Sequence, residues 1–188
     1  LIHHYSTSPS VFENKVVLRA LAQLKLEGIK VGLSLSGPEQ KSALYKAMEI
    51  MVDGIRLFDS VQLTWNILEN STTEALKDAK REGIGVMVKE ALANGRLYHY
   101  QHEASQLISA MEPIISSKKV SPDMVALAYV AQQDFVDTVL SGAATISHLE
   151  SNLKISDFEL ARADVEALDG IYQTPDVYWQ TRSRMEWN

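Results

Sequence analysis

Apolar and amphipathic segments alternate along the chain. Nearly continuous apolar runs predict strands at residues 1–4, 29–36, 60–66, 84–90 and 137–143. Apolar residues at helical spacing predict helices at residues 11–28, 38–54, 72–83, 122–133 and 146–155, and partial helix around 105–115. Ser71 is in place to cap the third of these helices. A further amphipathic helix is predicted at 157–172, and the tail after it is expected to pack on the surface of the domain.

This alternation predicts an α/β fold, and the length predicts that residues 1–188 form one domain, or a large part of one. Strands that are apolar on both faces belong to a parallel sheet covered by helices. Two architectures fit, a doubly wound sheet and a (β/α) barrel. The strand-to-helix turns lack a GxGxxG sequence, which weakens the dinucleotide-binding doubly wound alternative.

Composition narrows the function classes. The 188 residues are 46% hydrophobic, which indicates a packed globular chain, and they carry a formal net charge of −6, which argues against a nucleic-acid surface. The absence of cysteine excludes disulfides, thiolate catalysis and cysteine-bound metal, and it favours a reducing, cytoplasmic location. No apolar run is long enough to predict a membrane span. His99 and His102 have no clearly placed carboxylate partner, so we predict no metal site.

Functional groups of both architectures lie at the carboxyl ends of the strands. The candidates there are His3 or His4, residues 34–36, residues 62–66, Lys89 with Glu90, and residues 141–145. The last of these turns contains Gly142 and small residues, so backbone N–H groups at the following helix can bind an anion, although a tight turn also explains the composition. A lysine at the end of a barrel strand can also form a Schiff base. A barrel enzyme that acts on a sugar phosphate, with Lys89 as the nucleophile, therefore stays open as an alternative.

Five stretches in this order resemble the aldo-keto reductase family. They are LIHH, LAQLKLEGIKVGLSLS, FDSVQLTWNIL, GIGVMVKEALANGRL and VALAYVAQQDFVDTVLSGAATISHLESNL. The match covers essentially the whole chain but only the C-terminal half of the family, from its fourth strand onward. The resemblance therefore implies a (β/α)8 TIM-barrel type fold of which about five βα units are present, whereas a complete barrel usually has about 250 residues.

The resemblance also implies an oxidoreductase that uses NADP to reduce a small carbonyl substrate. By position, His3 is the active-site histidine, and Ser34 and Gln62 hold the nicotinamide carboxamide. The remaining cofactor-binding positions that the resemblance implies are Lys89, Glu90, Leu92, Gly95, Gly142, Ala143, Thr145, His148 and Asn152.

Four positions depart from the family pattern. Leu35 replaces an Asn, and Lys89 replaces an aromatic ring that lies under the nicotinamide. His148 replaces an Arg, and Gly142 a Lys, that favour the 2′-phosphate, so NAD stays possible beside NADP.

The Tyr, Lys and Asp that the family uses for proton donation precede its fourth strand and match no position of this chain. Loss of a general acid typically costs about 10²–10⁴-fold in rate. We therefore expect a fragment that carries the cofactor-binding half and is inactive alone, completed by the missing barrel half or prone to self-association through open sheet edges. The alternative is a non-catalytic relative that senses the cofactor or acts as a scaffold.

Overall fold

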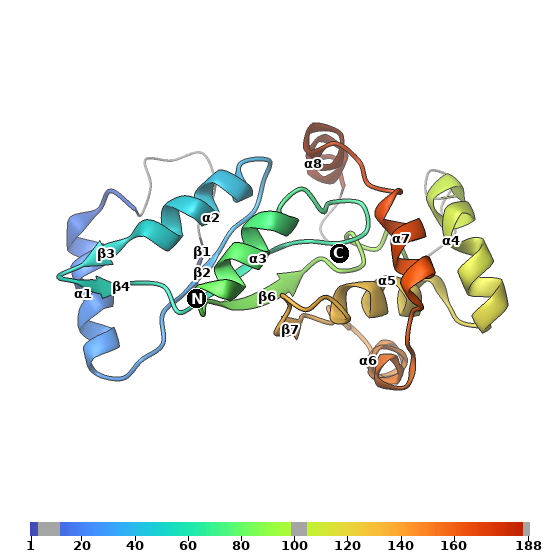
Figure 1. The fold of residues 1–188 in the computed structure, drawn as a ribbon, viewed down its shortest axis with the longest axis horizontal. Helices are drawn as coiled ribbons and strands as arrows, with labels where there is room; N and C mark the ends of the chain where they lie inside the picture. The colour runs from blue at the N-terminus through green and yellow to red at the C-terminus, as the bar shows by residue number, and fades with distance from the viewer. Residues whose placement is uncertain (4–11, 99–104, 186–188) are drawn as a thin grey trace.

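A computed structural model describes residues 1–3, 12–98 and 105–185 of the chain. Its main sheet has five strands in the order β1-β2-β5-β6-β7, and every neighbouring pair is parallel (Figure 1). The strands are β1 (Ile2–His3), β2 (Gly32–Ser34), β5 (Ser60–Thr64), β6 (Gly85–Lys89) and β7 (Thr138–Val139). The predicted parallel α/β sheet is therefore confirmed, and strands that follow one another in this order form part of a (β/α) barrel.

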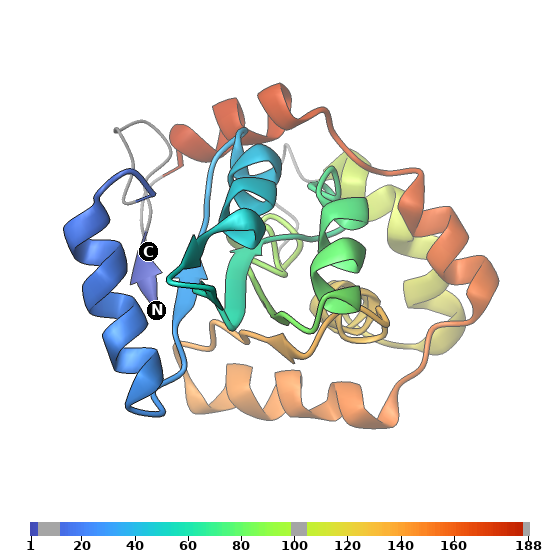
Figure 2. The same cartoon turned by 60° about the vertical axis from the view of Figure 1, so that its left-hand side comes forward.

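Helices surround these strands (Figure 2). Their bounds are α1 (Lys15–Leu26), α2 (Gln40–Glu49), α3 (Thr73–Arg81), α4 (Ser105–Lys118), α5 (Pro122–Ala131), α6 (Ile146–Leu153), the 3₁₀ helix η1 (Lys154–Asp157), α7 (Arg162–Asp169) and α8 (Pro175–Ser183). Helices α8 and α6 lie on opposite sides of the strands in both views (Figures 1 and 2). None of the helices in the described part of the chain is long and apolar enough to cross a membrane.

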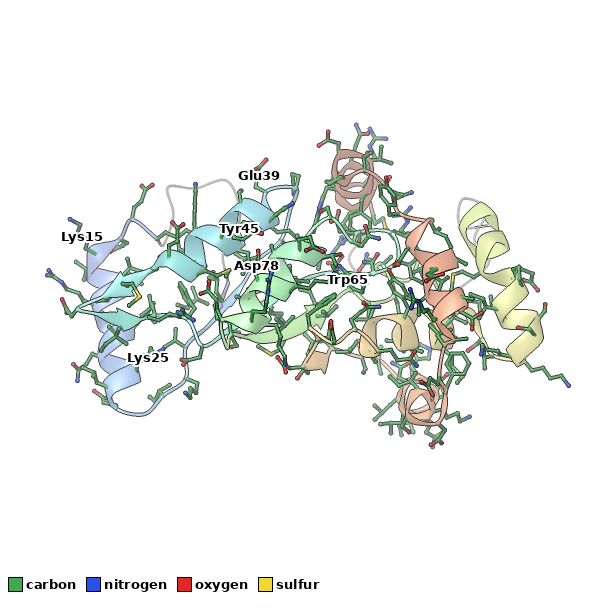
Figure 3. All side chains as sticks on the ribbon, viewed as in Figure 1. Lys15, Lys25, Glu39, Tyr45, Trp65 and Asp78 are labelled. Carbon is green, nitrogen blue, oxygen red and sulfur yellow. The ribbon has the colours of Figure 1, made fainter. Side chains whose placement is uncertain are left out.

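The core centres on Trp65, which follows β5 (Figure 3). Its ring stacks on that of Tyr129 with centroids 5.2 Å apart, and it meets the ring of Phe135 edge-on at 5.3 Å. The indole Nε1 donates a hydrogen bond of 3.0 Å to Thr73 Oγ1. Because these contacts come from α3, α5 and the segment after α5, one aromatic cluster fixes the helix layer against the end of β5.

The turn from α1 into β2 is built on Gly28 and closed by Asp59. Gly28 has a φ of 87°, and the backbone N–H of Ile29 donates to Leu24 O at 3.0 Å, which is the hydrogen bond of a Schellman turn. Asp59, just before β5, accepts hydrogen bonds from Val31 N at 2.8 Å and from Lys25 Nζ at 3.0 Å. The carboxylate therefore joins the end of α1 to the beginnings of two strands.

The same device recurs between α3 and β6. Gly83 has a φ of 76°, and Asp137, just before β7, accepts from Val86 N at 2.8 Å and pairs with Lys80. The residue patterns of the two turns also match, KLEGIKV at 25–31 and KREGIGV at 80–86. Two βα units thus use the same contacts to join a helix to the amino ends of two neighbouring strands.

Two predictions about individual segments are wrong. The helix predicted at 38–54 ends at Glu49, and a hairpin of β3 (Met51–Val52) and β4 (Ile55–Arg56) follows it. Asp53 and Gly54 have φ values of 49° and 80°, and positive φ at both central residues gives the tight turn that joins two strands. Ser71 does not cap α3, because its hydroxyl donates to the Glu69 carboxylate and Thr72 occupies the N-cap position.

The described part of the tail packs on the rest of the domain, as predicted. It forms α8, and one face of this helix is buried, since Tyr178 is fully buried and Arg182 is only 7% exposed. A buried arginine requires a partner, and this partner lies at the end of β6.

Candidate functional site

The carboxyl ends of β1, β2 and β5 place three of the predicted site residues in one row. The strand register pairs His3 with Ser34, and Ser34 with Gln62. Ser34 is 2% exposed and Gln62 is 9% exposed, so both polar side chains lie inside the sheet end and not at a solvated margin. The register therefore puts His3 in this row, whereas His4 lies outside the described residues.

Lys89, at the end of β6, reaches toward the same row. Its Nζ donates a hydrogen bond of 3.1 Å to Ser34 Oγ, and the side chain is half-buried. Burial lowers the pKa of Lys89, while the nearby Glu90 carboxylate opposes that shift. No carboxylate of the described part of the chain lies within ion-pair distance of this ammonium group. Such a lysine can hold an anionic group or, when neutral, act as an amine nucleophile.

Glu90 follows directly and has a backbone φ of 56°, which is uncommon for a residue with a side chain. Arg182 of α8 donates two hydrogen bonds to its carboxylate, from Nε at 3.0 Å and from the terminal guanidinium nitrogen at 3.1 Å. The Tyr178 hydroxyl donates to the same carboxylate at 3.3 Å, and Asn66 Nδ2 donates to the Glu90 carbonyl oxygen at 2.9 Å. Glu90 is therefore anchored from α8 and from the end of β5.

The segment after Glu90 turns tightly. Ala93, Asn94 and Gly95 have φ values of 48°, 57° and 86°. The backbone N–H of Ala93 donates to the Glu90 carbonyl oxygen at 2.8 Å, and that of Leu97 donates to the Leu92 carbonyl oxygen at 3.2 Å. Residues 90–97, called here the β6 loop, form one side of a pocket.

This pocket has a volume of about 430 Å³ and lies between the β6 loop and the turn from β7 into α6. The structure brings together in its lining most of the cofactor-binding residues predicted from the sequence, namely Glu90, Leu92, Gly95, Gly142, Ala143, His148 and Asn152. His148 and Tyr98 both line this pocket, and their rings contact each other with centroids 5.0 Å apart. We call it the loop pocket.

Four predicted residues lie outside this lining. Ser34, Gln62 and Lys89 form the cluster at the strand ends described above. Thr145 is the N-cap of α6, and its Oγ1 accepts a hydrogen bond of 3.2 Å from His148 N. Its hydroxyl therefore has a structural role at the start of α6.

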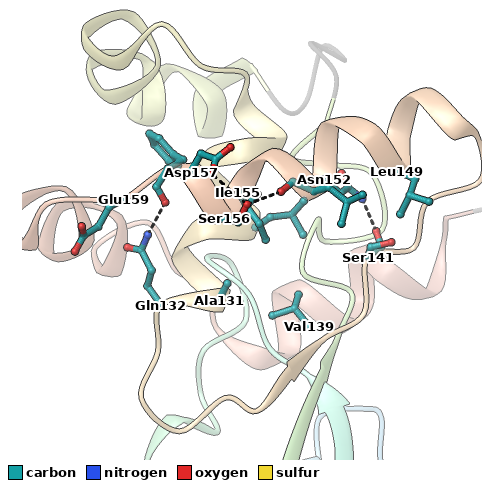
Figure 4. A pocket seen from close by; sticks show the side chains of 13 residues that line it. Ala131, Gln132, Val139, Ser141, Leu149, Asn152, Ile155, Ser156, Asp157 and Glu159 are labelled. Atoms are coloured by element: carbon teal, nitrogen blue, oxygen red, sulfur yellow. Dashed lines mark hydrogen bonds between the residues drawn. The ribbon is translucent and has the colours of Figure 1, made fainter.

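Asn152 joins the loop pocket to a second cavity. It is 6% exposed, and its Nδ2 donates to Ser141 O at 3.1 Å, while its buried Oδ1 has no hydrogen-bond partner among the residues that the structure describes. The second cavity, of about 740 Å³, lies between α5, β7, α6 and η1, and Ser141 and Asn152 line both cavities (Figure 4). A buried acceptor without a partner is suited to a ligand that donates a hydrogen bond.

The electrostatic character of the loop pocket is nearly neutral. Among the described residues that line it, Glu90 and His148 are the charged or readily titrated groups, and none is lysine or arginine. The carboxylate of Glu90 already holds the Arg182 guanidinium. No cluster of three or more His, Asp or Glu side chains that could hold a metal ion occurs in the part of the chain that the structure describes.

Sequence reasoning missed two residues of this region, Tyr178 and Arg182, whereas Asn66 belongs to the strand end at 62–66 that it named. Asn66 is fully buried, and its Oδ1 accepts hydrogen bonds from Leu68 N and Glu69 N, at 2.9 and 3.0 Å, while its Nδ2 donates to Tyr178 Oη at 3.1 Å. Its place at the end of a strand was the signal that marked it. Tyr178 and Arg182 gave none, because their partner Glu90 is remote in the sequence.

Parallel strands in consecutive order, helices outside them and polar groups at the carboxyl ends define part of a (β/α)8 barrel with a site at the usual end of the strands. The chain belongs to the aldo/keto reductase family, whose model matches residues 4–173. It is thus related to oxidoreductases that generally use nicotinamide cofactors.

Relatives with curated descriptions include Protein tas of Escherichia coli (strain K12) and of Shigella flexneri. Each is 32% identical over 84 residues, which is 43% of this chain and 24% of the relative. A solved structure, that of the thermostable aldo-keto reductase Tm1743 in complex with the inhibitor epalrestat, is similar with a TM-score of 0.60 and 19% identity. The match covers 82% of this chain and 53% of that one, so the chain spans about half the length of the solved relative, whose likeness shows the fold.

Proposed function

We propose that this chain is the nicotinamide-cofactor-binding half of an NAD(P)H-dependent carbonyl reductase. The observation that carries the proposal is the loop pocket, whose lining gathers seven residues that the family resemblance assigns to the cofactor. Ser34 and Gln62, assigned to the carboxamide end, lie at neighbouring strand ends. When bound, the cofactor supplies the hydride for reduction of the carbonyl group.

The shape of the cavities supports an extended dinucleotide. Ser141 and Asn152 line both the loop pocket and the larger cavity, and the Asn152 Oδ1, without a partner among the described residues, can accept a hydrogen bond from an exocyclic amine. Small residues at Gly142 and Ala143 leave room for a pyrophosphate near the backbone.

The choice between NADP and NAD depends on His148. The family resemblance favours NADP, but a 2′-phosphate would meet no lysine or arginine among the described residues of the loop pocket. A bidentate arginine is the usual partner of such a phosphate, so a histidine at this position should give NADPH little advantage over NADH.

Proton donation is the step that this chain does not supply. Tyr98 lines the loop pocket with its ring against that of His148, whereas Tyr178, beside Glu90, is fully buried and its hydroxyl is engaged with Asn66 and Glu90. Burial and the Glu90 carboxylate both raise the pKa of Tyr178, which makes it a poor acid. We therefore expect cofactor binding without carbonyl reduction from these residues alone, in a cytoplasmic setting consistent with the cysteine-free composition.

Open sheet edges add an expectation about partners. Within the described residues, β1 and β7 each pair on one side, so their other backbone groups are available for pairing. We expect association through these edges, with the rest of a barrel or with another copy of the chain. Sedimentation across a concentration series measures it.

The test of the proposed function is titration of the purified chain with NADPH and NADH, followed by cofactor fluorescence and melting temperature. Saturable binding and a rise in melting temperature are expected. His148→Ala should weaken NADPH binding, whereas Glu150→Ala, an exposed change on the same helix outside the pocket, should not. No binding of either cofactor at high micromolar concentration would refute the proposal.

A second candidate function rests on Lys89, because this half-buried amine has a lowered pKa and no carboxylate partner in the described chain. The neutral amine would add to a substrate aldehyde or ketone and release water, giving an imine. Borohydride reduction of such an imine leaves a stable adduct, and peptide mass mapping locates it. An unmodified Lys89 after incubation with small aldehydes and borohydride removes this candidate.

A further inference from the structure

The C-terminal helix α8 contacts the functional end of the sheet at Glu90 and at Asn66. Arg182 and Glu90 form a two-point ion pair with side chains only 9% and 17% exposed. Tyr178, one turn earlier on the same face of α8, adds a hydrogen bond to the same carboxylate. Planar two-point pairing fixes direction as well as distance, so α8 holds this carboxylate in one orientation.

The backbone of Glu90 needs such an anchor. A φ of 56° is disfavoured for residues that have a Cβ atom, and such conformations persist where surrounding contacts determine them. Here the side chain is held by Arg182 and Tyr178, and the carbonyl oxygen is held by Asn66. Contacts from three sides thus outweigh the local preference of the chain.

Glu90 is also the first residue of the β6 loop. Its conformation sets the direction in which the chain leaves β6, and Leu92 and Gly95 of that loop then line the loop pocket. Lys89, immediately before it, points to Ser34. A change at Glu90 therefore displaces both parts of the candidate site, the strand-end cluster and the loop pocket.

We propose that Arg182, assisted by Tyr178, is a positioning residue that fixes the β6 loop through Glu90 and thereby sets the affinity of the loop pocket for its nicotinamide cofactor. This role rests on the proposed function for the identity of the ligand. The geometry of the anchor does not depend on it.

The experiment compares four single variants of the chain and one double variant, Arg182→Gln with Glu90→Gly. Arg182→Gln removes the ion pair, Arg182→Lys keeps the charge but not the two-point geometry, and Glu90→Gly accepts the positive φ but cannot be anchored. Arg184→Gln is the matched control, because Arg184 is exposed near the end of the same helix. Dissociation constants for NADPH and NADH, hydrogen exchange of amides 91–97 and melting temperature are measured for each.

Arg182→Gln should weaken cofactor binding about tenfold and speed exchange in the β6 loop, within the range that coupled neighbours show. Arg182→Lys should restore part of both, and the control should match the wild type. Because Arg182 acts through Glu90, adding Arg182→Gln to Glu90→Gly should weaken binding no further, an outcome that a general structural role for Arg182 does not predict.

Unchanged affinity and unchanged loop exchange in Arg182→Gln would overturn the inference, as would full additivity in the double variant. If Arg182→Gln does not fold, Tyr178→Phe, which removes only the hydroxyl, decides: faster loop exchange supports the anchor and unchanged exchange refutes it. If the wild type binds neither cofactor, the proposed function fails, and loop exchange alone still decides whether Arg182 positions the loop.

Discussion

Replacement of Asp59 by alanine is expected to destabilise the chain more than its place on a connecting segment suggests. The carboxylate accepts the backbone N–H of Val31 at 2.8 Å and pairs with Lys25 at 3.0 Å. The side chains of Asp59 and Lys25 are only 19% and 16% exposed. Asp59→Ala removes the carboxylate, so the Val31 N–H loses its acceptor and Lys25 loses its ion-pair partner. Val31 lies at the beginning of β2 and is 5% exposed.

The expected loss has two parts. An unsatisfied buried N–H at Val31 costs about 1–3 kcal/mol. The ion pair with Lys25 contributes about 0.5–1 kcal/mol, the upper part of the range for partly exposed pairs. Asp59→Ala should therefore lower the free energy of unfolding by about 2–3 kcal/mol, and Asp59→Asn, which keeps an acceptor for Val31, by about 1 kcal/mol.

Urea unfolding followed by tryptophan fluorescence measures these losses. With a slope of about 2 kcal/mol per molar, Asp59→Ala should shift the midpoint by about 1 M. The corresponding Asp137→Ala should shift it less, because the side chains of Asp137 and Lys80 are each 39% exposed. Equal losses for Asp59→Ala and Asp59→Asn would refute the assignment of most of the effect to the Val31 N–H.

The pH dependence gives an independent check. Burial by itself raises the pKa of Asp59, but the hydrogen bond from Val31 and the charge of Lys25 outweigh it, so the pKa in the folded chain lies below its ordinary value. An acid with a lowered pKa stabilises the fold above the ordinary pKa of about 4, and that stability is lost as the pH falls through the lower folded value. The difference between wild type and Asp59→Asn should therefore shrink below pH about 4.

Lys89→Met should raise the free energy of unfolding at neutral pH, because burial lowers the pKa of Lys89 and the charged form is disfavoured in the fold. The gain should shrink as the pH rises toward the ordinary lysine pKa, and melts from pH 7 to 10 measure it; a loss of stability at pH 7 contradicts the reasoning. Burial also raises the pKa of Glu69, so the fold loses stability as the pH rises from the ordinary glutamate pKa through the raised pKa of the folded chain. Urea unfolding should therefore show Glu69→Gln to be more stable than wild type at pH 8 but not at pH 4. Trp65→Ala should cost about 3–5 kcal/mol in the same assay, since it empties the centre of the aromatic cluster; a cost below about 1 kcal/mol would show that the cluster collapses around the gap.

The sheet was predictable because each strand has its own signal. Leu33, Val61, Leu63, Val86 and Val88 are fully buried, and the runs that contain them are too apolar for any exposed element. The glycine at the end of α1 or α3 also has a local reason, because a left-handed turn requires it.

The hairpin after α2 was missed although its signal is present. Asp53-Gly54 is a preferred pair for a two-residue turn, but the apolar residues before it continue the helical spacing of α2. Strands of two residues each are too short to show alternation, so periodicity extended the helix through them.

Some residues of the candidate site were likewise predictable from local signals and others were not. Ser34, Gln62 and Lys89 could be proposed from their places at strand ends, since parallel strands bring those ends together. The anchor of Glu90 could not, because Arg182 lies 92 residues further along the chain and nothing local marks it as buried. Pairing between such remote residues is decided by the path of the whole chain.

Charged side chains at the two ends of the sheet differ in their partners, and this contrast supports the proposed functional role of the carboxyl end. At the amino ends of the strands, Asp59 and Asp137 each have a lysine and a backbone N–H as partners. At the carboxyl ends, Lys89 is half-buried without a carboxylate partner in the described chain, and the backbone of Glu90 is left-handed. Features that oppose stability gather where binding requires them, whereas stabilising contacts accumulate elsewhere. Because one sheet shows both patterns, we attribute the unfavourable features to the proposed ligand site and not to a general looseness of packing.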